Sequence, residues 1–165
     1  MDSRLGAVVA LAVVGLSLVA LPAVVPPTAS DPGGYNRTTV TLVDDDGARL
    51  ATVDVRVADT RDERYLGLSD TESLADGEGM LFVHPREARH TYVMRRMDFP
   101  LDIVFVAANG TVTRIHHAPV PEKIPGGNGK FPGVGRFVLE VPRGYANQTG
   151  LDVGDRVVVP DRVVD

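Results

Sequence analysis

After residue 37 the apolar positions fall in short runs, several of which alternate with polar residues in the two-residue period of a β-strand. The first such pattern predicts a hairpin of strands at 38–43 and 48–57, joined by the turn sequence D-D-D-G. A helical spacing of apolar positions follows. It predicts one short helix that is capped by Asp59 or Thr60 and ends at Ser69.

Six further β-prone runs follow the helix, at 79–83, 90–94, 101–106, 111–117, 136–141 and 155–159. Between them we expect a surface turn at 84–89, a long irregular loop at 119–135 and a turn or short helix at 143–150. Seven or eight short strands with one or two short helices predict a mainly β (α+β) fold. The expected architecture is a small antiparallel β-barrel-like domain.

The segment from Met80 to Val106 holds the most apolar of these runs. The run 101–106 is apolar on both faces, which is typical of a central strand. Asp102 interrupts it between two apolar neighbours. A carboxylate at such a position needs a partner or a water-filled recess.

Residues 1–30 form a targeting segment, because Leu5–Val25 is an uncharged run of 21 residues with Arg4 just before it. Three interpretations stay open: a transmembrane signal anchor, a cleaved signal peptide and a misread start codon. We expect residues 31–37 to be a tether and 38–165 to be a single domain. The domain then lies on the extracytoplasmic face of the cell membrane, or is secreted if the leader is cleaved.

Three of the four asparagines begin an N-x-[ST] sequon, and these are Asn36, Asn109 and Asn147. Together with an export segment, this pattern predicts surface glycosylation. The alternative is that asparagine and threonine occur together because both favour turns.

Composition narrows the function classes. The net charge is −5, and only two lysines accompany fifteen arginines, so the chain lacks the basic character of a nucleic-acid binder. The excess of aspartate over lysine fits a salt-adapted protein, although biased codon usage would produce the same pattern. The absence of cysteine excludes disulfides, thiolate catalysis and iron–sulfur clusters.

Five motifs follow one another in a characteristic order: R-Y-L-G-L at 64–68, G-M-L-F at 79–82, M-R-R-M-D-F-P-L-D-I-V-F at 94–105, V-L-E-V at 138–141 and G-D at 154–155. In this order they resemble the uncharacterised domain-of-unknown-function family 192, over residues from about 50 to 160. The resemblance implies a small, mostly β fold that is often exported and has no established activity.

Four positions depart from the usual family pattern. Ser69 stands where the family usually has methionine, and Val93 where it has tryptophan. Arg96 and Met97 replace an asparagine and a threonine. Site chemistry that relies on the asparagine and threonine side chains of the family pattern is therefore not expected here.

The candidate site consists of Arg64, Tyr92, Met94, Arg95 and Asp102. An arginine can pair with a carboxylate through two parallel hydrogen bonds. One interpretation makes Arg64 and Asp102 the polar anchors of a ligand pocket at the barrel mouth. The other, which we favour for this pair, is a structural salt bridge between Arg64 and Asp102 that fixes the helix to the strand end.

Metal binding would depend on the histidines, since there is no thiolate. His116 and His117 are adjacent on a strand and point to opposite faces, so they cannot chelate one ion together. A site would need His90 and one of this pair to meet, with Asp102 or Glu140. Solvated histidines are the simpler reading, and we expect no cofactor.

Glu140 is expected to face solvent, because it alternates away from three apolar neighbours on the strand 136–141.

Three functions follow from these patterns. The leading hypothesis is a membrane-tethered extracytoplasmic module that binds a small polar ligand or a partner. The second is a hydrolase-like or metal-dependent enzyme that uses Asp102 with a histidine. The third is a structural envelope domain.

Overall fold

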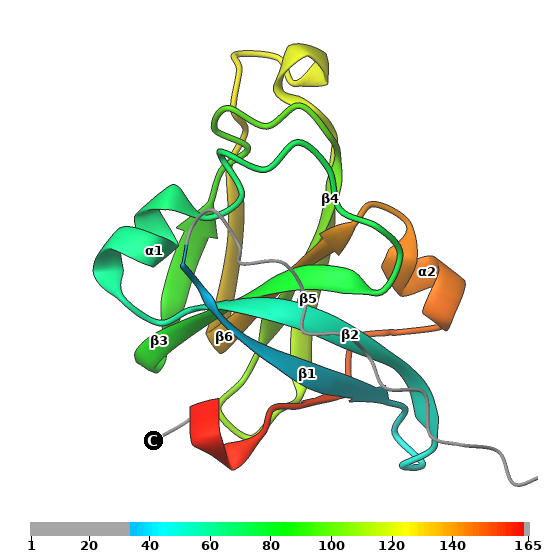
Figure 1. The fold of residues 1–165 in the computed structure, drawn as a ribbon. Coiled ribbons are helices and arrows are strands. Elements are labelled where there is room, and N and C mark those ends of the chain that lie inside the picture. Colours follow the sequence, from blue (N-terminus) through cyan, green and yellow to red (C-terminus); the bar gives the residue numbers. More distant parts are fainter. Residues whose placement is uncertain (1–33, 164–165) are drawn as a thin grey trace, which may run out of the picture. The chain divides into compact units, whose positions relative to one another are not determined.

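A seven-stranded sheet forms the body of residues 34–163, the part of the chain that this computed structural model describes (Figure 1). The strand order is β5-β4-β6-β3-β2-β1-β7. The strands are β1 (Asn36–Val43), β2 (Arg49–Ala58), β3 (Glu78–Tyr92), β4 (Leu101–Val106), β5 (Val112–Ala118), β6 (Phe131–Pro142) and β7 (Arg156–Val158). The helices are α1 (Arg61–Leu66), α2 (Tyr145–Thr149) and two 3-10 turns, η1 (Pro121–Lys123) and η2 (Asp161–Val163).

The sheet curls into a half-barrel because its two edges approach each other. A β-bridge joins Thr111, just before β5, to Arg156 in β7. Beside it, the Val112 N–H donates to the Asp155 carbonyl over 2.8 Å. These contacts bring the first and last strands of the sheet order together at one end.

The predicted mainly β fold with two short helices is confirmed, and so is the first hairpin, formed by β1 and β2. Strand β1 begins at Asn36, so the last two residues of the expected tether pair in the sheet. The targeting segment predicted for residues 1–30 lies outside the described residues. Within residues 34–163, no helix is long and apolar enough to cross a membrane.

The antiparallel prediction is wrong for one pair of strands. Strands β2 and β3 are parallel, with Val55 opposite Gly79 and Val57 opposite Leu81. The chain reaches this arrangement by crossing over through α1, since parallel neighbours cannot be joined by a tight turn. The crossover places α1 above one face of the sheet.

The surface turn predicted at 84–89 is also wrong, because β3 runs through it. The residues up to Val83 and those from Ala88 onward all pair with β6, and the register shifts between Val83 and Ala88. The polar run is therefore an irregularity within one long strand rather than a connection. Strand β6 begins at Phe131, so the predicted loop at 119–135 is shorter than expected.

Both faces of the central strands are buried. One cluster lies on the side of α2 and β7 and includes Val104, Val106, Leu139 and Val141. The second cluster lies on the side of α1 and includes Met80, Phe82, Leu101, Ile103, Phe105 and Val138. Strand β4 is buried at all six positions and contributes to both clusters.

Gly133 in β6 leaves room for the Phe105 ring of the second cluster. A Cβ at this position would lie 2.3 Å from Cγ of the buried Phe105 ring, closer than two non-bonded carbon atoms can approach. The Phe105 ring therefore packs directly on the strand backbone, beneath the bend of β3.

Candidate functional site

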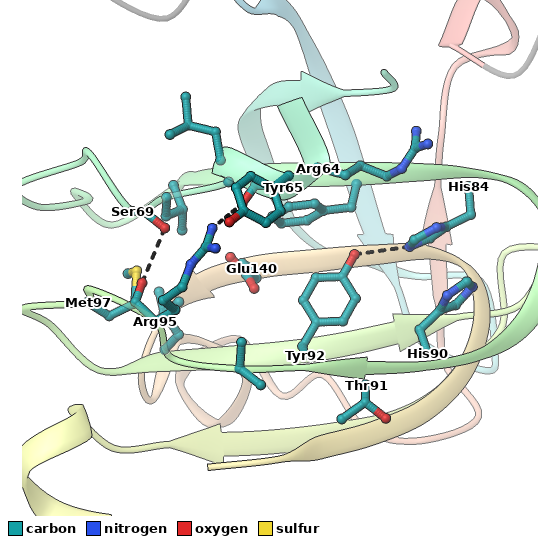
Figure 2. A pocket seen from close by; sticks show the side chains of 16 residues that line it. Arg64, Tyr65, Ser69, His84, His90, Thr91, Tyr92, Arg95, Met97 and Glu140 are labelled. Atoms are coloured by element: carbon teal, nitrogen blue, oxygen red, sulfur yellow. Dashed lines mark hydrogen bonds between the residues drawn. The ribbon is translucent and has the colours of Figure 1, made fainter. Parts of the chain in front are cut away.

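A recess of about 340 Å³ opens between α1, the loop that follows it, β3 and β6 (Figure 2). Its polar lining consists of Arg64, Tyr65, Ser69, His84, His90, Thr91, Tyr92, Arg95 and Glu140. Its apolar side chains come from Leu66, Leu68, Phe82, Val93, Met97 and Leu101. Polar residues outnumber apolar ones in this lining, but most of the surface that faces the recess is apolar. A concave site with an apolar surface and convergent polar groups resembles a small-molecule pocket.

Helix α1 is short and depends on its caps. The Thr60 side chain accepts from the Glu63 N–H, and the Glu63 carboxylate accepts from the Thr60 N–H, which is a capping box. Gly67 ends the helix at a φ of 54°, and a Cβ there would lie 3.2 Å from Cζ of Phe82. Glycine therefore lets the chain turn close over the recess wall.

Arg64 anchors the helix to the sheet. Its guanidinium donates to the carbonyl of Asp59 and, over 2.8 Å, to the carbonyl of Val83. These bonds fix the side chain between the end of β2 and the middle of β3. Arg64 lines the recess from there.

Arg95 closes the opposite side of the recess. Its guanidinium donates to the Tyr65 carbonyl and lies over the Tyr65 ring, 4.1 Å from the centroid. The Ser69 hydroxyl donates to the Arg95 carbonyl over 3.2 Å, which joins the loop after α1 to the segment after β3. The next residue, Arg96, has a left-handed φ of 53°.

Two histidines and a tyrosine line the right-hand end of the recess in Figure 2. The rings of His84 and His90 stack with centroids 3.6 Å apart, and His84 Nε2 lies 3.1 Å from the Tyr92 hydroxyl. Burial, and then the neighbouring His90, lowers the pKa of His84 to about 4. Burial also lowers the pKa of His90 and raises the pKa of Tyr92 well above its ordinary value. All three side chains are therefore neutral at pH 7.

Glu140 lies at the floor of the recess, and the prediction that it faces solvent is wrong. Only 5% of the residue is exposed. Alternation along β6 does place Glu140 on the other face of the strand from Leu139 and Val141. The sheet is covered on both faces, however, so the face that carries Glu140 is also interior. Burial raises the pKa of the Glu140 carboxyl to about 8. Within residues 34–163 the carboxyl has no hydrogen-bond or ion-pair partner.

The structure brings three of the five predicted site residues together. Arg64, Tyr92 and Arg95 line the recess. Met94 is buried in the cluster beneath α1 and does not line it. Asp102 follows the recess residue Leu101 on β4 and therefore points to the opposite face of the sheet.

The predicted pair between Arg64 and Asp102 does not form. Asp102 is fully buried, with its Oδ1 2.6 Å from His117 Nδ1. Its Oδ2 accepts from the N–H groups of Gly144 and Ala146, each over 3.0 Å. Asp102 thus joins β5 and the start of α2 to β4, far from the helix that carries Arg64.

The histidines do not gather as a metal site would need. His90 stacks on His84, His116 Nε2 lies 2.9 Å from the Pro132 carbonyl oxygen, and His117 contacts Asp102. In the described part of the chain, no three histidine, aspartate or glutamate side chains converge on a possible ion.

The three sequon asparagines are all exposed. Asn36 lies at the start of β1, Asn109 in the turn between β4 and β5, and Asn147 in α2. Glycosylation at these positions stays a prediction.

Comparison with known proteins now identifies the family. The sequence model of DUF192, described as "Uncharacterized ACR", matches residues 41–159. The chain belongs to the DUF192 family. The match contains every strand that borders the recess, so the predicted resemblance is confirmed over the whole site.

Two solved structures share this DUF192 fold. A protein of unknown function from Novosphingobium aromaticivorans DSM 12444 is 31% identical, with a TM-score of 0.68, and the match covers 86% of this chain and 94% of that one. A protein from Sinorhizobium meliloti 1021, named as a candidate transcription regulator, is 26% identical, with a TM-score of 0.67 and coverage of 74% and 93%. No curated protein matches the chain.

Proposed function

We propose that this DUF192 domain is a binding or accessory module that holds a small polar ligand in the recess beneath α1. The observation that carries the proposal is Glu140, a buried carboxyl that opens onto the recess and has no partner within residues 34–163. Buried polar groups in folded proteins are nearly always hydrogen-bonded, so an unmatched one at the floor of a cavity points to a missing partner.

The size and walls of the recess support the same proposal. Ligand pockets usually occupy about 300–1,000 Å³ and are lined mainly by apolar side chains, with few polar groups that set orientation. The recess of about 340 Å³ lies at the lower end of that range.

The enzyme alternative gains one observation, the contact of 2.6 Å between Asp102 and His117. Neither residue lines the recess, however, and Asp102 Oδ2 is already occupied by two backbone N–H groups. We therefore propose that this pair is structural. The name of the Sinorhizobium protein would suggest gene regulation, but a net charge of −5 does not favour contact with phosphates.

The ligand proposal is tested by thermal unfolding of the full chain against small acids, amines, sugars and nucleotides. A ligand at a hundred times its Kd stabilises by about 2.7 kcal/mol, a shift of several degrees. Glu140→Leu is expected to remain folded, since it replaces a buried carboxyl, which burial already disfavours in its charged form, by an apolar side chain. It is expected to lose the shift. The control Glu122→Leu, on the exposed turn η1, should keep it. If no class of compound shifts the transition, the recess is not a ligand site.

We also propose that residues 1–30 tether this domain to the extracytoplasmic face of a membrane, on the strength of the uncharged run Leu5–Val25. The full chain is expected to stay with membranes after alkaline carbonate extraction, and to be digested by protease added to intact cells or spheroplasts. Release of the whole protein into the supernatant with its leader intact would contradict the anchor. Recovery of a secreted form that starts near residue 31 would support the cleaved signal instead.

A further inference from the structure

We infer that the recess binds the carboxylate of a small organic acid with an apolar body, held between the Glu140 carboxyl at the floor and the Arg95 guanidinium at the mouth. The inference rests on the proposed function, because it names the chemical class of ligand for the same recess. Figure 2 shows both side chains among those that line it.

The charge of the lining selects an anion. Its charged side chains are Arg64, Arg95 and Glu140. At pH 7 Glu140 is mostly protonated, and the lining histidines are neutral, so the two arginines leave the recess positive. A positive cavity with low-dielectric walls attracts anions and disfavours amines.

Arg95 has the geometry to receive a carboxylate. A guanidinium carries five N–H donors in a planar fork. Among residues 34–163 the Arg95 guanidinium makes one hydrogen bond, to the Tyr65 carbonyl. The Tyr65 ring beneath it and the bond from Ser69 to the Arg95 backbone hold the residue in place. The other N–H groups can donate two parallel bonds to a planar carboxylate.

Glu140 supplies the complementary donor. In its protonated form the carboxyl has one O–H, which a carboxylate oxygen of the ligand can accept. Two carboxyl groups that share one proton are stable where two carboxylates would repel each other.

The rest of the recess lining favours a ligand with an apolar part besides its carboxylate. Leu66, Leu68, Phe82, Met97 and Leu101 form most of the rest of the lining. Burial of a chain of four or five carbons against them favours binding, and each further buried methylene adds to the affinity. Such a carboxylate exists in free acids and at the C-terminus of a peptide that ends in an apolar residue.

Binding should depend on pH through Glu140. The titratable or charged groups that face it are Tyr92, His84 and His90 from β3, Arg64 and Tyr65 from α1, and Arg95 after β3, while β4 offers Leu101. The histidines are already neutral above pH 7, and Tyr92 stays protonated. Affinity is therefore expected to be nearly flat below pH 7 and to fall about tenfold between pH 7 and pH 9.

The test is calorimetric titration of the full chain in a nonionic detergent with hexanoate, hexanamide and hexylamine at pH 7 and pH 9. Hexanoate should bind most tightly, and about tenfold more weakly at pH 9. Glu140→Gln should keep hexanoate binding through its amide N–H and lose the pH dependence. Arg95→Gln should weaken hexanoate by about tenfold to a hundredfold, the usual value of a charged hydrogen bond. The exposed neighbour supplies the control, since Arg96→Gln should change nothing.

A second arm distinguishes the source of the carboxylate. The tripeptide Ala-Ala-Leu and its C-terminal amide are titrated beside hexanoate. Tighter binding of the peptide acid than of hexanoate assigns the recess to peptide C-termini, and the reverse order assigns it to free acids. Either result supports carboxylate recognition, provided that the amide binds poorly.

Two outcomes would overturn the inference. If hexylamine or hexanamide binds wild type as tightly as hexanoate does, or if hexanoate binding is unchanged at pH 9, the ligand is not a carboxylate held by Glu140. The recess would then remain a ligand site of another class. If a broad set of compounds also fails to bind, both the inference and the proposed function fall.

Discussion

Asp102→Ala is expected to lower the free energy of unfolding by about 3–5 kcal/mol, as urea unfolding of the full chain would measure. The carboxylate is fully buried and accepts from His117 and from the N–H groups of Gly144 and Ala146. Its removal leaves one buried and one partly buried backbone donor without an acceptor and releases the histidine. Each unsatisfied buried donor costs about 1–3 kcal/mol. The start of α2 should loosen first.

Two further variants check this account. Asp98→Ala, at an exposed position just before β4, should change stability by no more than about 0.5 kcal/mol. Asp102→Asn keeps one acceptor oxygen and should be affected less than Asp102→Ala. Ligand binding in the recess should survive in Asp102→Asn, since Asp102 lies on the other face of the sheet. Loss of binding with unchanged stability would restore Asp102 as a functional residue.

Glu140→Gln is expected to be more stable than wild type at pH 8 by about 4 kcal/mol, and nearly equal to it at pH 4.5. Burial raises the pKa of Glu140 in the folded chain to about 8, from its ordinary value of 4.5. Below pH 4.5 both the folded and the unfolded state hold the proton. Between these values only the unfolded state releases it, so the stability of wild type falls by about 1.4 kcal/mol per pH unit as pH rises.

The difference in stability between wild type and Glu140→Gln reports the ionisation of Glu140 alone. His84 acts in the opposite direction below pH 6.5, because its pKa is lowered on folding, but it does so equally in wild type and variant. Glu122→Gln, on the exposed turn η1, should follow wild type at every pH. A constant difference between Glu140→Gln and wild type from pH 5 to pH 8 would show that Glu140 is ionised in the folded protein throughout.

The two carboxyl groups show what a single sequence can and cannot specify. The apolar run 101–106 was sufficient to predict that Asp102 is interior and needs a partner. The partners themselves come from 15, 42 and 44 residues away, so no local pattern names them. Arginine is a common partner of a buried carboxylate. Here a histidine and two backbone N–H groups contact Asp102 instead.

The prediction that Glu140 faces solvent was wrong for a different reason. A period of two assigns residues to faces, but it does not say whether a face meets water or a second layer. In β6 both faces are covered, one by α2 and β7 and the other by α1 with its following loop. A polar residue in such a strand is not a surface residue, and only the tertiary arrangement reveals this.

The predicted site residues that line the recess have a common origin. Arg64 lies on α1 and Tyr92 on β3, and both segments show a clear spacing of apolar residues in the sequence. Arg95 comes three residues after β3 ends at Tyr92. The bent course of β3 brings His84 and His90 into the same recess. That bend comes from a register shift inside a polar run, which resembles a surface turn when read without its partner strand.

The pairing of β1 with β7 has a consequence for how the chain is made. Strand β1 ends at Val43, and its outer neighbour begins only at Arg156, so more than a hundred residues must leave the ribosome before this edge is covered. At about 5–20 residues per second, that interval lasts several seconds. During it the hairpin presents an open, β-branched edge that other chains can extend. A nascent chain of this protein therefore needs a chaperone, or prompt passage out of the crowded cytosol, more than its finished fold does.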